Sequence, residues 1–249
     1  MQIIYNDDYL NSKYTDKVNI FQREISEHPF ILLARPRKNI YNNKINQNQF
    51  LQRVEKIIDS GLKFLELPWE DNDNWLTLMQ RLRLKFPNIL IGSSTIKNKK
   101  SIDDSLKIGL NFSMMRFWDK ELFNYSKDKN FLLIPGLRQL NHLNAAIFCN
   151  CKIIKIFPVK EKEQILDINK FKKNTFIGAG DLSIKELDDY KSLGYSAIII
   201  GQKGFDGKIF DPQIFEYLKT KINWSNITHS IYGIEHDSKV NDLQELKQP

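Results

Sequence analysis

Ile153-Ile154-Lys155-Ile156-Phe157-Pro158 is an apolar run that carries one lysine where a buried strand normally has valine or leucine. Burying an ammonium without a partner is costly, so such a lysine usually gives up its proton or serves a purpose. A neutral lysine amine attacks ketones to form a Schiff base, which makes Lys155 a candidate nucleophile. The alternative is that its stem packs in the core while its amine reaches solvent.

This run is the sixth of eight short apolar segments that alternate with amphipathic ones along the chain. Apolar runs of this length are typical of strands, and a period near 3.6 between them is typical of helices. The predicted strands are Phe30–Ala34, Leu62–Leu67, Ile89–Gly92, Asn111–Met115, Phe131–Ile134, Lys152–Ile156, Thr175–Gly178 and Ala197–Ile200. The predicted helices include Asn48–Ser60, Asn74–Phe86, Ile102–Ile108, Arg138–Cys149, Lys160–Phe171 and Ser183–Leu193.

The alternation of strands and helices decides the fold class. Gly61, Gly109 and Gly194 stand just before predicted strands, where glycines commonly end helices. Eight strand–helix units over about 200 residues favour a closed (β/α)₈ TIM barrel of the α/β class over an open doubly wound sheet. We expect a single domain at residues 27–223, with an N-terminal extension at 1–26 that packs on the bottom or outside of the barrel. Residues 224–249 form a polar C-terminal tail.

Composition excludes several classes of protein. The chain has 249 residues, 41% of them hydrophobic, which is enough for a sizeable core. No apolar stretch approaches the ~20 residues of a membrane span, and the first residues are too polar for a secretory signal, so we expect a cytoplasmic protein. The net charge of +7 is scattered, so nucleic-acid binding is not expected. Cys149 and Cys151 are too close for good disulfide geometry and are expected to be free thiols.

Polar residues end the inward faces of five predicted strands. Alternate side chains of a barrel strand point inward, and barrel active sites form at the carboxyl ends of the strands. Five such residues at one mouth are hard to obtain from core packing alone, because unpaired buried charges are costly. The predicted inward sets are Leu33 with Arg35, Phe64 with Glu66, Ser93 with Thr95, Met114 with Arg116, and Ile153 with Lys155 and Phe157.

These residues fit a Schiff-base lyase. Lys155 would attack the keto carbon of a 2-oxo acid, and Glu66 would move protons as general acid and base. Arg35 and Arg116 would bind the substrate carboxylate through paired hydrogen bonds, and Thr95 would donate one more. The alternative for Glu66 is a structural ion pair with Lys155 inside the barrel.

Other sites leave weaker signals. The four histidines are dispersed, so we expect no metal and no cofactor. Gly178-Ala179-Gly180 follows the seventh strand and would either present backbone N–H groups to an anion or form a turn without a ligand. Gly201–Gly204 follows the eighth strand, where many barrels bind phosphate, and Lys203 adds a suitable charge.

The chain resembles the 2-keto-3-deoxy-6-phosphogluconate and 4-hydroxy-2-oxoglutarate (KDPG/KHG) aldolases from about Pro29 to Phe215. These are class I (β/α)₈ enzymes that usually assemble as trimers. The most specific likeness is the run around Lys155, which is similar to the family's K-[FL]-F-P segment with the Schiff-base lysine. The resemblance implies Lys155 as nucleophile, Glu66 as proton shuttle, and pyruvate plus an aldehyde as products. The other similar segments are Gly61–Leu67, which bears the glutamate, Gly92–Thr95 (G-A-G-T), Ile134-Pro135-Gly136 (I-P-G) and Arg35.

Four departures from the family pattern fall near the expected pocket. Glu70 stands where the family has a substrate-binding arginine, and Met115–Phe117 replaces its S-P-G. Asp181 replaces a glycine after the seventh strand, and Lys203 replaces a serine after the eighth. We expect Arg116 to take over part of the substrate binding and the substrate to lack a phosphate. Alternatively, Lys203 neutralises Asp181 and leaves a phosphate site of changed geometry.

The residues and the resemblance together give nine candidate site residues, and three function hypotheses follow from the sequence. The leading one is a homotrimeric, metal-independent class I aldolase acting on a small 2-oxo acid. The second is an aldolase-fold protein without lyase activity that binds a metabolite or a protein partner. The third, a basic RNA-binding module, would require a strong salt dependence of binding. The catalytic candidates are Lys155 and Glu66, and the substrate-binding candidates are Arg35, Thr95, Arg116, Pro135, Phe157, Gly180 and Lys203.

Overall fold

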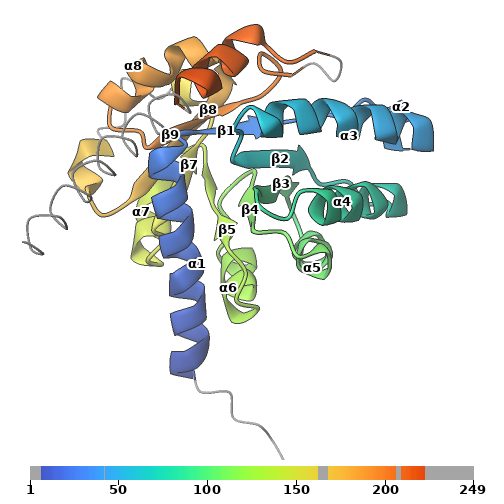
Figure 1. Cartoon of the computed structure of the whole chain (residues 1–249). Coiled ribbons are helices and arrows are strands. Elements are labelled where there is room, and N and C mark those ends of the chain that lie inside the picture. Colours follow the sequence, from blue (N-terminus) through green and yellow to red (C-terminus); the bar gives the residue numbers. More distant parts are fainter. Residues whose placement is uncertain (1–6, 42, 162–167, 206–208, 222–249) are drawn as a thin grey trace, which may run out of the picture.

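A computed structural model describes residues 7–41, 43–161, 168–205 and 209–221. Its strands run side by side and all pair in parallel around a central axis, with helices outside them (Figure 1). The strands are β1 Phe30–Leu33, β2 Phe64–Pro68, β3 Leu90–Ile96, β4 Phe112–Met115, β5 Leu133–Ile134, β6 Gly136–Leu137, β7 Ile153–Ile156, β8 Thr175–Leu182 and β9 Ala197–Ile200.

Two of these nine strands are halves of one barrel strand. Pairing runs in the order β5-β4-β3-β2-β1-β9-β8-β7-β6, so β5 and β6 end the ladder on either side of Pro135. Proline has no N–H to donate to a ladder, which interrupts the strand at that residue. Its carbonyl still accepts a hydrogen bond of 2.9 Å from the Lys155 backbone N–H and links the halves to β7. The predicted (β/α)₈ barrel is therefore confirmed.

The helices between the strands follow the predicted pattern with shifted ends. α3 begins at Asn43, whose side chain caps the backbone N–H groups of Ile45 and Asn46, and α5 ends at Gly109 in the left-handed conformation expected of a C-cap. α2 and α6 were not among the predicted helices. The helices are α1 Asp7–Glu27, α2 Lys38–Tyr41, α3 Lys44–Asp59, α4 Asp73–Lys85, α5 Lys99–Ile108, α6 Lys120–Asp128, α7 Leu140–Phe148 and α8 Leu187–Ser192; residues 212–221 are also helical.

The segment after β7 departs from prediction. In place of one α-helix over Lys160–Phe171, the structure has two short 3₁₀ helices, Val159–Glu161 and Ile168–Phe171. Residues 162–167 lie outside the described residues. The helix predicted from Ser183 also starts as a 3₁₀ turn, Ile184–Glu186, before α8 begins. The amphipathic pattern marked where these connections lie but not their helix type.

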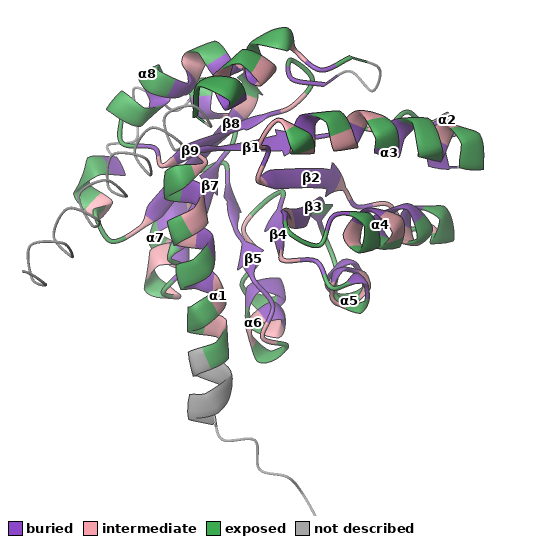
Figure 2. Ribbon diagram, in the orientation of Figure 1, coloured by how far each residue is buried: buried purple, intermediate pink, exposed green. Residues whose placement is uncertain are grey.

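The core has two layers, and α1 completes the inner one. Residues alternating along the strands bury one set of side chains inside the barrel and the other set against the helices, so that the strands are buried while the helices expose their outer faces (Figure 2). Val18, Phe21 and Ile25 of α1 join the inner set, and the Phe21 ring contacts those of Phe64 and Phe112 edge to face. The extension therefore closes the bottom of the barrel.

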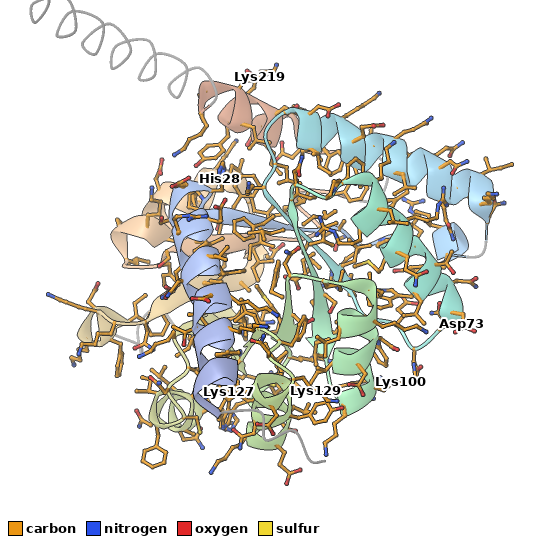
Figure 3. The ribbon with its side chains drawn as sticks, turned by 60° about the horizontal axis from the view of Figure 1, so that its bottom comes forward. His28, Asp73, Lys100, Lys127, Lys129 and Lys219 are labelled. Carbon is orange, nitrogen blue, oxygen red and sulfur yellow. The ribbon has the colours of Figure 1, made fainter. Side chains whose placement is uncertain are left out.

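Figure 3 shows α1 crossing the bottom of the barrel, with His28 just past its C-terminal end and Lys127 and Lys129 near its other end. Lys17 donates a hydrogen bond of 2.5 Å to the carbonyl of Asn130, and Gln22 donates one of 2.8 Å to Thr175 Oγ1. The carboxyl ends of the strands thus lie at the opposite end of the barrel from α1. The predicted C-terminal tail lies outside the described residues. No described helix is both long and apolar enough to cross a membrane.

Candidate active site

A cavity of about 480 Å³ opens at the carboxyl ends of the strands. It lies where the sequence placed a site and brings together side chains that are distant along the chain. Seven of the nine predicted site residues line it. Five of them come from five different strands or strand ends: Arg35, Glu66, Thr95, Arg116 and Lys155. The remaining lining residues are Leu33, Ser94, Phe157, Ala179, Gly180, Asp181, Ile199, Gly201 and Gln202.

Lys155 on β7 and Glu66 on β2 are the buried ionisable groups of this cavity. Lys155 is 8% exposed and Glu66 is 1% exposed. Burial lowers the pKa of Lys155, against the smaller opposing effect of Glu66. Burial also raises the pKa of Glu66, against the smaller effects of Lys155, Ser94 and Arg35. Both groups are therefore shifted toward their neutral forms, which suits a nucleophilic amine and a proton-transferring carboxyl group.

No ion pair joins Lys155 to Glu66 within the part of the chain that the structure describes. Lys155 and Glu66 therefore do not form the structural ion pair that was the alternative for Glu66. Glu66 Oε2 and the neighbouring Ser94 Oγ are buried without a hydrogen-bond partner. Because unpaired buried polar atoms are costly, these two oxygens mark a polar spot in the cavity that is suited to a bound polar group.

The third strand corrects the predicted inward face. Ser93 points away from the cavity, because its hydroxyl is within 2.8 Å of Ser105 Oγ on α5 and 2.6 Å of Ser113 Oγ on β4. Ser94, on the opposite face, lines the cavity instead. The pairing of β3 with β4 shifts register between Ser93 and Ile96, and Thr95 has a φ of 59°. This irregularity brings Thr95 to the cavity despite its position next to Ser94.

Arg35, Thr95 and Arg116 are exposed residues of the cavity wall. Thr95 is β-branched and holds a positive φ, a conformation that such residues seldom adopt and that tends to persist at functional sites. The Arg116 guanidinium lies 5.2 Å from the centroid of the Phe117 ring. Two guanidinium groups at the rim, with Lys155 below them, make the cavity suitable for a carboxylate.

The four other predicted binding residues are placed differently. Phe157 and Gly180 line the cavity, whereas Pro135 and Lys203 are not among its lining residues. Pro135 contributes through its carbonyl, which accepts the Lys155 backbone N–H at 2.9 Å. Gly180 has a φ of 131°, and a Cβ there would lie 3.1 Å from Pro158 Cα, so the position favours glycine.

Lys203 is paired with Asp181, the aspartate that replaces a glycine of the family pattern. Its Nζ lies 3.0 Å from Asp181 Oδ2 and donates a hydrogen bond of 2.7 Å to the Asp181 carbonyl. Asp181 itself lines the cavity. This pair therefore links the carboxyl end of β8 to the turn after β9.

Sequence reasoning missed several lining residues. Ser94 was hidden by the irregularity in β3, since strict alternation assigns the inward position to Ser93. Leu33 and Asp181 had been noticed, but not as binding candidates. Ala179, Gly201 and Gln202 lie in segments that the sequence marked for an anion, but they were not candidates by themselves. Ile199 carried no signal that separates it from ordinary barrel positions. Within the described residues, no group of three or more His, Cys, Asp or Glu side chains is placed to hold a metal ion.

Comparisons with known proteins agree with this geometry. The profile of the KDPG and KHG aldolase family matches residues 41–215, which is most of the chain. The chain belongs to the KDPG and KHG aldolase family. It is thus a member of an aldolase, and hence lyase, family, as its residues around Lys155 and Glu66 suggested. The comparison with curated proteins gives no match.

Solved structures share the fold at low sequence identity. A native KDPGal structure is 16% identical with a TM-score of 0.65, over 78% of this chain and 93% of that one. The KDPG aldolase of Legionella pneumophila, with pyruvate captured as a covalent carbinolamine, is 17% identical with a TM-score of 0.60, over 78% and 90%. A designed protein cage made by fusing symmetric oligomeric domains is 15% identical with a TM-score of 0.62, over 87% and 79%.

Proposed function

We propose that this protein is a class I aldolase that cleaves a 2-oxo-4-hydroxy acid into pyruvate and an aldehyde through a Schiff base on Lys155. The observation that carries the proposal is the buried pair of Lys155 and Glu66, which share one cavity, form no ion pair and are both shifted toward neutrality. A structural pair would be expected to shift toward its charged forms. Family membership supports the same reaction class.

The proposed reaction begins when the neutral amine of Lys155 attacks the C2 ketone. The carboxyl group of Glu66 gives its proton to the departing hydroxyl, so that water leaves, an iminium ion forms and Glu66 becomes a carboxylate. The ionised carboxylate of Glu66 then takes the proton of the C4 hydroxyl, the C3–C4 bond breaks, and its electron pair moves into an enamine while the aldehyde departs. Glu66 returns this proton to C3. Water then hydrolyses the iminium ion, which releases pyruvate and the neutral amine, and the proton freed in this step returns to the Glu66 carboxylate. No metal takes part in this scheme.

Substrate orientation falls to the rim of the cavity. Arg35 and Arg116 would hold the C1 carboxylate, because guanidinium groups match carboxylate geometry through paired hydrogen bonds. Ser94 and Thr95 would add hydroxyl donors. Phe157 and Gly180 would shape the wall, and Pro135 would position β7 through its carbonyl. Lys203 would act through Asp181 and not through the substrate.

The proposed substrate is an unphosphorylated 2-oxo-4-hydroxy acid, either 4-hydroxy-2-oxoglutarate or another acid of this class. A phosphate near β8 and β9 would face the Asp181 carboxylate and would have to compete with it for Lys203. A lysine that is already paired with a carboxylate contributes less to binding a second anion, because the first pair must be broken. The loss is small for an exposed pair. The phosphorylated alternative therefore remains an outcome of the substrate test.

The activity test is pyruvate release from a panel of 2-oxo-4-hydroxy acids with and without a terminal phosphate. Lys155→Met should abolish turnover, and Lys152→Met provides the matched control, because Lys152 is an exposed lysine just before the same strand. Activity that survives Lys155→Met would contradict the mechanism.

The second candidate is an aldolase-fold protein that binds a metabolite or partner without cleaving it. Glu70 and Asp181 favour it, since each introduces a carboxylate where the family pattern has none. This candidate predicts binding of 2-oxo acids without imine formation at Lys155.

Assembly and location are also proposals. We propose a homotrimer in the cytoplasm. The designed cage of symmetric oligomeric domains supports an oligomer of this fold. Sedimentation of the purified chain is the measurement for its oligomeric state.

A further inference from the structure

A second cavity of about 420 Å³ adjoins the candidate active site and shares two residues, Thr95 and Arg116, with it. We call it the aromatic groove. The turns after β2, β3 and β4 form it, so it lies on the side of the barrel away from the Asp181–Lys203 pair. Its lining residues are Trp69, Thr95, Ile96, Lys97, Arg116, Phe117, Trp118, Asp119 and Leu122.

The walls of the groove are mainly aromatic and apolar. Trp69 is 5% exposed and is held by a hydrogen bond of 3.0 Å from its Nε1 to Asp104 Oδ2. Trp118 packs on Phe123 of α6 with ring centroids 5.7 Å apart. Phe117, in contrast, is 41% exposed, so its side chain is accessible to a ligand in the groove. Fixed aromatic walls beside an exposed ring favour a flat apolar ligand.

Cations flank these walls. Lys97 Nζ lies 5.5 Å from the centroid of the Trp69 ring, and it forms no ion pair within the described residues. Lys100 lies at 5.6 Å from the same ring but is paired with Asp71 and Asp104. Asp119, the one carboxylate of the groove lining, accepts the backbone N–H of Leu122 and caps α6. With Arg116 assigned to the C1 carboxylate, Lys97 is the cation of the groove lining left to pair with the ligand, which favours a ligand with a negative charge.

A small substrate fits within the first cavity alone, so the groove is available to a larger aldehyde half. At about 480 Å³ it is already in the range that encloses drug-sized ligands, so a five-carbon keto acid fits within it alone. A substrate anchored at Lys155 and passing Thr95 and Arg116 would extend into the groove through its aldehyde half.

We propose that the aromatic groove binds the aldehyde half of the substrate, and that this half is an aromatic group carrying an acidic substituent. The inference rests on the proposed aldolase function. It names Phe117 and Lys97 as specificity-determining residues, of which Phe117 would stack on the ring and Lys97 would pair with its charge.

The test in the synthetic direction is addition of pyruvate to 4-carboxybenzaldehyde, with glyoxylate and benzaldehyde as comparison aldehydes. The inference predicts that kcat/KM for 4-carboxybenzaldehyde exceeds that for glyoxylate by about tenfold or more. Phe117→Ala should lower this ratio about tenfold. Lys97→Ala should lower the preference for 4-carboxybenzaldehyde over benzaldehyde. The matched controls are Phe148→Ala, an exposed aromatic on α7, and Lys99→Ala, which lies over Tyr125 outside the groove. Neither control should change the ratios.

Binding of benzoate to the Lys155→Met chain, measured by calorimetry, separates the two proposals because it needs no imine. Benzoate binding that weakens about tenfold in Phe117→Ala supports the groove even if no imine forms at Lys155. An imine at Lys155 with a glyoxylate preference that Phe117→Ala leaves intact overturns the groove and keeps the aldolase. Loss of oligomers in Phe117→Ala without a change in specificity would instead make this face an interface between copies, and would also overturn the inference.

Discussion

Lys203 and Asp181 join the ends of two neighbouring barrel strands, with Lys203 Nζ 3.0 Å from Asp181 Oδ2. The pair stands where the sequence suggested an anion site. Asp181→Ala should release Lys203 and remove a negative charge from the cavity. We expect KM for a phosphorylated 2-oxo-4-hydroxy acid to fall about tenfold relative to its unphosphorylated analogue, a change of about 1.4 kcal/mol. Steady-state kinetics on both substrates checks this, and an unchanged ratio would show that the pair does not exclude phosphate.

Arg116 and Lys155 should fail in different ways when replaced. Loss of a charge-assisted hydrogen bond costs roughly 1.5–3 kcal/mol, so Arg116→Ala should raise KM for the acid about tenfold or more with a smaller effect on kcat. Lys155→Met should leave no measurable turnover. Small, equal effects of the two substitutions would remove the basis for both assigned roles.

The pH dependence of imine formation reports the coupling between Lys155 and Glu66. The Glu66 carboxylate raises the pKa of Lys155, while burial lowers it more. Glu66→Gln removes the raising effect, so the amine should lose its proton at lower pH. The acid limb of borohydride trapping with pyruvate, measured against pH, should move to lower pH in this variant. A limb that moves to higher pH would mean that Glu66 does not act on Lys155 in this way.

Stability should also carry the signature of the buried pair. The pKa of Glu66 lies above its usual 4.5, so the folded state binds more protons and stability falls as pH rises from 4.5 toward the folded pKa. The pKa of Lys155 lies below its usual 10.5, so the unfolded state binds more protons and stability rises as pH increases from the folded pKa toward 10.5.

The double variant Lys155→Met with Glu66→Gln removes both titrations. It should be more stable than the original chain near neutral pH by about 1–4 kcal/mol, because burial of these two ionisable groups disfavours their charged forms in the folded state, and its melting temperature should vary less with pH. Thermal unfolding between pH 4 and pH 10 is the measurement. A less stable double variant would mean that the pair contributes to folding.

Ser93 and Ser94 offer a comparison of adjacent residues. Ser93→Ala removes a hydroxyl that lies between Ser105 and Ser113, and should cost about 1–3 kcal/mol of stability with little change in kcat. Ser94→Ala removes a buried hydroxyl without a hydrogen-bond partner that faces the cavity, and should lower activity with little loss of stability. The measurements are thermal unfolding and turnover of both variants. A loss of activity in Ser93→Ala together with a loss of stability in Ser94→Ala would contradict the assignment.

Most of the barrel could be predicted from the sequence because its strands are nearly continuous apolar runs and its helices are amphipathic. Each predicted strand is present, with ends that differ by a few residues. Strict alternation placed Arg35, Glu66, Arg116 and Lys155 correctly at one cavity. It failed at β3, because a register shift and the positive φ of Thr95 are set by packing and leave no periodic signal.

Three other features also needed the three-dimensional structure. The barrel strand that Pro135 interrupts continues as β6, whereas the predicted strand ended at Ile134. The engagement of Lys203 by Asp181 joins residues 22 positions apart, and the sequence left its outcome open. The aromatic groove gathers residues from three separate turns, and only their proximity in the structure reveals it.

The central claim is that Lys155 forms a Schiff base with pyruvate. Borohydride reduction of the protein with pyruvate, followed by intact-mass and peptide mass spectrometry, tests it most directly. The account predicts a single reduced pyruvyl adduct on the peptide containing Lys155, present in Lys152→Met and absent from Lys155→Met. Folded protein that gains no adduct, or gains it on another lysine, would contradict the account.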